Sequence, residues 1–137
     1  MNLPLLTFDD FVTASGKYPE RLTSPYLTEG VKDNIEVLRA VIIAFLAELN
    51  IVATISSGFR PPTVNEKTKN SAKNSLHMRG LAVDLVDTDG SIKRTISLKP
   101  HLLAKYKLWM EDPSSAQGWC HLDLGIRPDR AVRIFKP

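Results

Sequence analysis

The chain has 137 residues, 43% hydrophobic and 24% charged, which is ordinary for a globular domain. A net charge of +3 is too small to indicate a nucleic-acid partner, and no apolar run reaches the roughly 18 residues of a membrane span. The single cysteine, Cys120, excludes an internal disulfide and a multi-cysteine zinc site. The N-terminal stretch lacks a basic n-region, so we expect synthesis in the cytoplasm without a signal peptide.

Hydrophobic periodicity predicts two helices in the first third of the chain. Residues 7–15 are expected to form a short helix capped by Thr7. Residues 29–49 are expected to form a long one between Thr28 and Asn50, because their apolar residues recur at helical spacing. The other expected elements are a strand at 51–58, an irregular loop at 60–65, a polar helix at 64–74, a strand at 81–87, a helix at 91–110 broken at Pro100, a loop at 111–118, and closing strands at 119–125 and 131–137.

These elements mix helices and strands without a regular βαβ repeat. The sequence therefore predicts an α+β fold, with a small antiparallel sheet and helices packed on it. The length fits one domain that spans residues 1–137.

Polar side chains interrupt two of the predicted strands. In the first, Val83 and Leu85 alternate onto an apolar face, while Asp84 lies on the other face beside the small Ala82. An unpaired carboxylate in such a strand is costly, so Asp84 requires a compensating partner.

The strand at 119–125 shows the same alternation. Trp119, His121 and Asp123 share one face, and Cys120 lies on an apolar opposite face, which predicts a core role for the cysteine. We expect the two strands to be neighbours that bring Asp84 and His121 onto one face.

His77, in the loop before the first of these strands, completes a set of two histidines and one carboxylate. This set is typical of a catalytic zinc site, which keeps one coordination position open for water.

The motif around these residues is similar to that of a known family. SLHMRGLAVD, residues 75–84, resembles the S-x-H-x-x-G-x-A-x-D signature of the M15 family of zinc D,D-peptidases. SSGFR, ending at Arg60, resembles the S-G-[YF]-R segment of that family, and WCHLD resembles the segment with its second histidine ligand. The resemblance implies an M15/hedgehog-like zinc peptidase fold, with Zn²⁺ held by His77, Asp84 and His121.

The resemblance also implies a substrate. The family includes D-alanyl-D-alanine carboxypeptidases and phage endolysins, so the implied substrate is the peptide stem of bacterial peptidoglycan. Arg60 would bind it near the scissile bond, and Ser75 belongs to the extended motif. From the residues themselves, Asn65 and Trp119 are further candidates for substrate contact. Without a signal peptide, a phage lysis enzyme or a virion-associated protein fits better than a periplasmic host enzyme.

The sequence departs from the family pattern at the general base. Many members carry an acid three residues before the last histidine, where this chain has Gly118. We predict that Glu111, in LWMEDP, replaces it, with Asp123 as the second choice. Asp112 is a weaker third choice, better explained as a turn residue before a proline.

Each assignment has a structural alternative, and His101, which has no partner in the motif, is expected to be incidental. The alternatives are a hydrogen-bonded loop histidine for His77, a salt bridge to Arg79 or Arg60 for Asp84, a surface ion pair for Arg60, a cap or turn for Ser75, a helix cap for Asn65, a solvated loop carboxylate for Glu111, a C-terminal arginine partner for Asp123, and packing for Trp119.

We therefore predict a zinc metallopeptidase that acts on peptidoglycan stem peptides. The alternative is a non-catalytic, zinc-stabilised cell-wall-binding or virion structural module, which Gly118 favours. A small nucleic-acid binder is favoured only by the pI of about 9.1. The sequence leaves open the oligomeric state and the bond that is cut.

Overall fold

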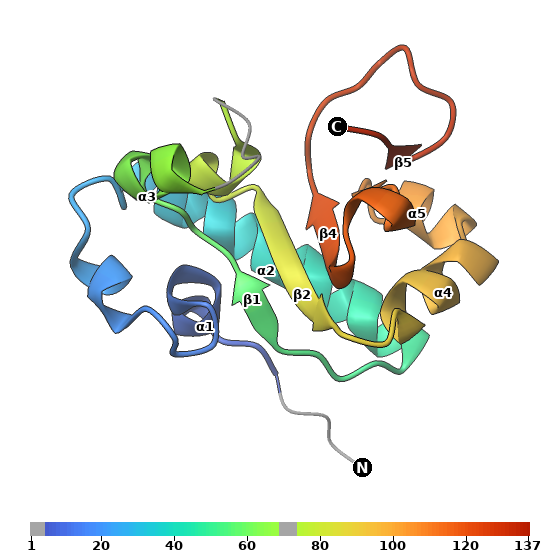
Figure 1. Ribbon diagram of the computed structural model, residues 1–137, viewed down its shortest axis with the longest axis horizontal. Coiled ribbons are helices and arrows are strands. Elements are labelled where there is room, and N and C mark those ends of the chain that lie inside the picture. The colour runs from blue at the N-terminus through green and yellow to red at the C-terminus, as the bar shows by residue number, and fades with distance from the viewer. Residues whose placement is uncertain (1–4, 69–73) are drawn as a thin grey trace.

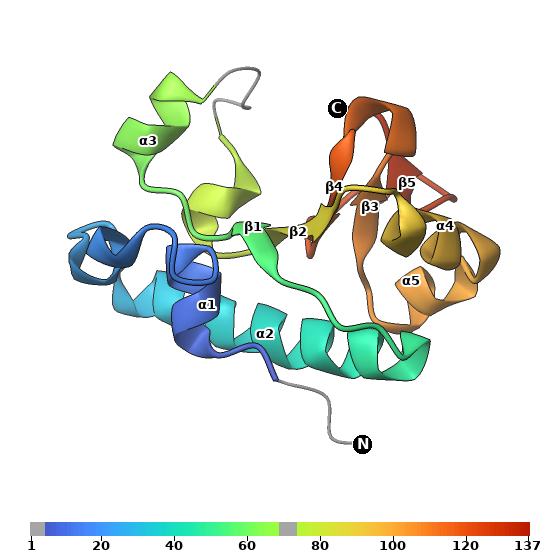
Figure 2. The same ribbon diagram turned by 60° about the horizontal axis from the view of Figure 1, so that its bottom comes forward.

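A five-stranded sheet with the order β1-β2-β4-β3-β5 forms the centre of the computed structural model, which describes residues 5–68 and 74–137. Figure 1 shows the long helix α2 crossing behind this sheet, and Figure 2 shows it running beneath the strands. The strands are β1 (Ile55–Ser57), β2 (Ala82–Asp87), β3 (Trp109–Glu111), β4 (Gly118–Asp123) and β5 (Ile134–Phe135). The helices are α1 (Phe8–Thr13), α2 (Glu29–Leu49), α3 (Pro62–Lys67), α4 (Ser91–Leu98) and α5 (His101–Lys105), and the 3₁₀ turns are η1 (Pro19–Thr23), η2 (Leu76–Arg79) and η3 (Pro113–Ser115).

The sheet is mostly antiparallel. β2 pairs with β1 on one side and with β4 on the other, and β4 pairs with β3, all in antiparallel fashion, while β3 and β5 are parallel. The prediction of an α+β fold with a small, largely antiparallel sheet is confirmed. Across the described residues, none of the helices is both long and apolar enough to cross a bilayer.

Both N-terminal helices begin where their capping residues predict, and α2 also ends as predicted, whereas α1 ends at Thr13 and is shorter than the predicted 7–15. The Thr7 side chain accepts a hydrogen bond from the Asp10 amide and caps α1, and Thr28 caps α2 in the same way through the Val31 amide. Asn50 ends α2 in the left-handed conformation, with φ of 56°.

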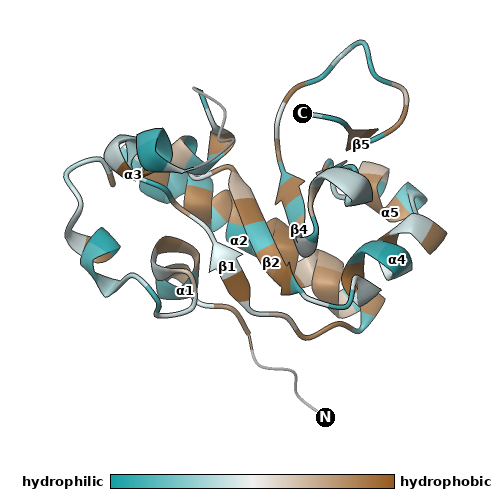
Figure 3. Cartoon of the chain, viewed as in Figure 1, coloured by the Kyte–Doolittle hydropathy of each residue, from teal (hydrophilic) through white to brown (hydrophobic). Residues whose placement is uncertain are grey.

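The core lies behind the sheet, where one hydrophobic cluster joins the buried side of α2 to the apolar faces of the strands. Val83 and Leu85 of β2 and Cys120 and Leu122 of β4 have no exposed surface. Figure 3 shows β2 as mostly brown with a teal band midway along it. The core role predicted for Cys120 is confirmed, and burial raises the pKa of its thiol.

Several predicted boundaries are wrong for identifiable reasons. The segment 60–65 was expected to be a loop, but α3 starts at Pro62, because proline suits the first turn of a helix. Asn65 lies inside α3 and does not cap a following helix. The polar helix expected at 64–74 falls partly on residues 69–73, which lie outside the described residues.

The largest error concerns the end of the helix predicted at 91–110. The break at Pro100 is confirmed, but α5 ends at Lys105, and Lys107 takes a positive φ of 57°. The chain then forms β3, because Trp109 and Met110 pair with β4 and are buried there. The strands expected at 51–58 and 131–137 are also shorter than predicted.

A glycine sets the approach of α1 to β1. A Cβ atom on Gly58 would lie 1.9 Å from the Phe11 carbonyl oxygen, which accepts the Phe59 amide at 2.8 Å. We expect Gly58→Ala to lower the free energy of unfolding by at least about 2 kcal/mol in urea denaturation, because the backbone must move apart. Gly30→Ala is the control, since a Cβ there meets nothing within 4 Å. A Gly58→Ala protein as stable as the wild type would contradict this packing.

Candidate metal centre

The centre of the site is a cross-strand pair on the polar face of the sheet. Asp84 of β2 lies directly opposite His121 of β4 in the antiparallel register, so both side chains project from the same face. Ala82, two positions before Asp84, shares that face by strand alternation. The neighbouring strands and the common face predicted from alternation are therefore present in the structure.

The third member, His77, comes from the turn η2. The Ser75 side chain accepts the His77 amide at 3.2 Å and begins η2, which is the capping alternative considered for this serine. Gly80 ends the turn with a φ of 73°, and a Cβ there would lie 2.7 Å from Ile35 Cγ1 of α2. Gly80 therefore lets η2 pack against α2, and this packing places His77 beside β2.

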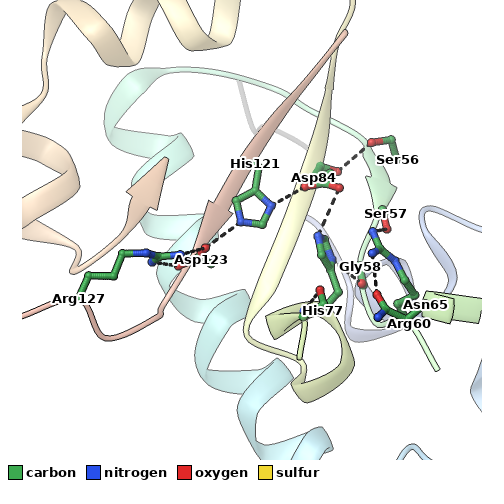
Figure 4. A network of polar contacts seen from close by, with 11 residues as sticks. Ser56, Ser57, Gly58, Arg60, Asn65, His77, Asp84, His121, Asp123 and Arg127 are labelled. Atoms are coloured by element: carbon green, nitrogen blue, oxygen red, sulfur yellow. Dashed lines mark hydrogen bonds and ion pairs between the residues drawn. The ribbon is translucent and has the colours of Figure 1, made fainter. Parts of the chain in front are cut away.

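The three side chains converge closely. His77 Nε2 lies 3.3 Å from Asp84 Oδ2, and His121 Nδ1 lies 2.8 Å from Asp84 Oδ1. One ligand atom from each residue falls within 4.8 Å of the other two. Figure 4 shows both imidazole rings turned toward the carboxylate between them.

The His77 ring has the tautomer that a metal ligand needs. Its Nδ1 lies 2.9 Å from the Gly58 carbonyl oxygen, which can only accept a hydrogen bond, so Nδ1 carries the proton. Nε2 is therefore the nitrogen that faces Asp84 and that a metal could bind. Such a backbone contact is the usual way of orienting a metal-binding histidine.

The charges around the cluster favour a positive charge at His121, which lies between the carboxylates of Asp84 and Asp123. Burial opposes ionisation of Asp84, but His77 and His121 hold its pKa well below the ordinary value. Burial alone would lower the pKa of His121, yet its hydrogen bonds to Asp123 and Asp84 raise the pKa to about 10. A divalent cation would take the place of the proton on the His121 nitrogen that faces Asp84. These donors, two imidazole nitrogens and one carboxylate, therefore fit a zinc ion.

Asp123 contacts His121 on the side away from Asp84. Its Oδ2 lies 2.8 Å from His121 Nε2, and Arg127 donates two hydrogen bonds to the same carboxylate, at 2.7 and 3.1 Å. Burial would raise the pKa of Asp123, but the hydrogen bonds from His121 and Arg127 keep it below the ordinary value. Asp123 therefore has the geometry of an orienting group, and the predicted pairing with a C-terminal arginine is present.

Glu111 lies on the same face of the sheet, on a strand and not in the predicted loop. The pairs Trp109–Asp123 and Met110–Leu122 set the register of β3 and β4. Continued by one residue, this register points to His121 as the neighbour of Glu111, and the charge of His121 acts on the Glu111 carboxyl. Burial raises the pKa of this half-buried carboxyl, and the nearby His121 opposes the rise. Asp112, in contrast, accepts hydrogen bonds from Ser114 and caps η3, which is the turn role expected for it.

Arg60 approaches the cluster from the side of β1. Its guanidinium donates to Asn65 Oδ1 at 3.0 Å and to Ser57 Oγ at 3.3 Å, while its amide donates to the His77 carbonyl at 3.1 Å. Burial lowers the pKa of Arg60, and the charge of Asp84 opposes this. The structure thus brings Arg60 and Asn65 together next to the metal centre. The contact between Asn65 and Arg60 has no signal in the sequence.

The structure also places three further positions that the sequence singled out. Trp119 is 36% exposed and lies on the same face as His121, opposite Val86, so the core does not enclose it. His101 is exposed at the start of α5, outside the His77–Asp84–His121 cluster. Gly118 begins β4, exposed and with a φ of 96°.

Two imidazoles and one carboxylate, with a further carboxylate beside them, are the arrangement found in zinc-dependent hydrolases. The family model described as Peptidase M15 matches residues 8–107, so the chain belongs to the M15 peptidase family and is a peptidase. Members of this family are metallopeptidases, usually with zinc. The matched segment contains Arg60, His77 and Asp84 and ends before Glu111 and His121. Comparison with curated proteins gave no match, and neither did comparison with solved structures.

Proposed function

We propose that this M15 peptidase depends on zinc and hydrolyses peptide bonds in the stem peptides of bacterial peptidoglycan, as a carboxypeptidase or an endopeptidase acting next to D-alanine. One observation carries the proposal. Asp84 of β2 and His121 of β4 lie opposite each other with His77 beside Asp84, and Glu111 of the neighbouring strand β3 lies close enough to feel the charge of His121. The peptidoglycan substrate is supported by the similarity of residues 75–84 to the signature of the zinc D,D-peptidases.

The ligands would be His77 through Nε2, Asp84 through its carboxylate and His121 through Nδ1. A zinc ion bound there supplies Lewis acidity, which polarises a carbonyl and makes water more acidic. Asp123 holds the His121 ring through Nε2, so that Nδ1 faces the ion.

Glu111 is the proposed general base. It takes a proton from the attacking water and returns it to the leaving amine, so that the carboxylate is regenerated in each cycle. Burial raises the pKa of Glu111 in the metal-free protein, which supports a role in proton transfer. Asp123 is less suited to this role, because Arg127, the Gly125 amide and His121 already occupy its oxygens.

Arg60 and Trp119 are the proposed substrate contacts. The hydrogen-bond partners of the Arg60 guanidinium, Asn65 and Ser57, are both neutral, and its charge, which acts on Asp84, would also stabilise a substrate carbonyl or carboxylate bound at the metal centre. Trp119 offers an exposed aromatic surface on the same face of the sheet. Ser75 and Asn65 would contribute by holding η2 and Arg60 in place.

Digestion of purified peptidoglycan tests this proposal. We expect zinc-loaded protein to release new amino groups and to shorten the stem peptides, as measured by mass spectrometry of the muropeptides. Chelator-treated protein should release none, and adding zinc back should restore the release. Zinc-loaded protein that sediments with peptidoglycan without cutting it would overturn the proposal and support a non-catalytic wall-binding module.

A further inference from the structure

An arginine clamp lies behind the metal centre, in the part of the chain that follows the segment matched by the family model. Arg127 Nη1 donates to Asp123 Oδ1 at 2.7 Å, and Nη2 donates to Oδ2 at 3.1 Å. The Asp123 side chain is 1% exposed and that of Arg127 is 21% exposed. Figure 4 shows the clamp in line with His121 and Asp84.

The clamp leaves Asp123 little freedom to rotate. Oδ1 also accepts the Gly125 amide at 2.9 Å, and Oδ2 also contacts His121 Nε2 at 2.8 Å. Both carboxylate oxygens therefore have two partners each, in a buried place where such charge-assisted hydrogen bonds are strong.

The turn after β4 is shaped around the clamp. A Cβ atom on Gly125 would lie 2.7 Å from Arg127 Nη1 and 3.0 Å from Asp123 Oδ1. The glycine therefore leaves the space through which the guanidinium reaches the carboxylate.

The Arg127 guanidinium also contacts aromatic rings. The Arg127 Cζ atom lies 3.9 Å from the centroid of the Phe135 ring and 5.1 Å from that of Trp109. The Phe135 ring also contacts His121 edge-on at 5.8 Å, and Phe135 pairs with Glu111 in the sheet. Arg127 thus contacts side chains from three neighbouring strands, β4, β3 and β5.

We propose that Arg127 is a positioning residue for the zinc site: it fixes the Asp123 carboxylate, which in turn fixes the His121 ring so that Nδ1 faces the metal. This inference rests on the proposed zinc site. It makes the C-terminal segment 124–137 part of the metal-binding machinery, although that segment supplies no ligand. Metal-binding histidines depend on such outer contacts, whose loss typically weakens metal affinity by about 10- to 100-fold.

The test is a double-mutant cycle read out as zinc affinity, measured by competition with a chromophoric chelator. We expect Arg127→Met and Asp123→Asn each to weaken zinc binding by about 10-fold or more. The double variant should be no weaker than Asp123→Asn alone, because Arg127 acts through Asp123. Arg127→Lys keeps the charge but loses the two-pronged contact, so it should resemble Arg127→Met.

The control is Arg130→Met, which removes an exposed arginine from the same loop and should leave zinc affinity unchanged. The visible spectrum of the cobalt-substituted protein gives a second readout, and we expect it to change in Arg127→Met and not in Arg130→Met. Thermal unfolding of the metal-free variants shows whether they are folded.

The outcomes separate this inference from the proposed function. A wild type that binds no zinc would overturn the zinc site itself. Wild-type zinc affinity in Arg127→Met or Arg127→Lys, or additive losses in the double variant, would overturn the positioning role and leave the zinc site standing. A lower melting temperature with unchanged zinc affinity would show that Arg127 is only a structural residue.

Discussion

Glu111→Gln is expected to lower the rate of peptidoglycan hydrolysis by about two to four orders of magnitude without loss of zinc or fold. The amide has nearly the same shape as the carboxylate but cannot accept the proton of the attacking water. Glu111 lies next to His121 on the metal face of the sheet, and no hydrogen bond to the proposed ligands depends on it in the described residues. The measurement is the initial rate of amino-group release at matched zinc content.

Two neighbouring carboxylates provide the controls. Asp112→Asn changes the adjacent residue, whose side chain caps η3, and should leave the rate near that of the wild type. Asp123→Asn should cost much less than Glu111→Gln once its zinc site is saturated, because Asp123 acts on His121 and not on water. The opposite ranking of Glu111 and Asp123 would move the general base to Asp123.

His121→Ala is expected to weaken zinc binding by at least about 100-fold and to reduce hydrolysis to background. The substitution removes one of three ligands and takes a hydrogen-bond partner from the buried Asp84. The metal-free protein should also lose about 1 to 3 kcal/mol of stability for that second reason. Zinc content after dialysis and urea denaturation measure the two effects.

His101→Ala is the matched control for this experiment, because His101 is exposed on α5 and is not among the residues of the cluster. It should keep both zinc and activity. Zinc content that survives His121→Ala unchanged would show that the metal is bound elsewhere.

The convergence of His77, Asp84 and His121 could be predicted in part from the sequence, because strand alternation is a local property. Alternation alone placed Asp84 and His121 on polar faces, with Val83, Leu85, Cys120 and Leu122 on the apolar side. The motif around His77 supplied the rest, since η2 is short and its cap and its terminating glycine lie within the motif.

The position of Glu111 could not be predicted in the same way. The run LWM before it fits a helix as well as a strand, because three apolar residues carry no periodicity. Pairing with β4 and β5, which lie at distant positions in the chain, decided the outcome. Because of this non-local pairing, Glu111 lies on a strand, on the same face as His121, and not in the expected loop.

The partner of Asp123 was only half predictable. The sequence indicated an arginine from the C-terminal group, which contains several. The choice of Arg127 depends on the turn at Gly125 and on the rings of Phe135 and Trp109, whose positions are set by the folded sheet. Contacts of this kind are made by the tertiary structure and leave no spacing pattern in the sequence.

The most direct test of the proposed zinc site is a crystal structure of the zinc-soaked wild-type protein with anomalous data collected at the zinc edge. We predict one strong anomalous peak per chain, at bonding distance from His77 Nε2, an Asp84 carboxylate oxygen and His121 Nδ1. An ordered His77–Asp84–His121 cluster without an anomalous peak, or with zinc bound only at other residues, would contradict this prediction.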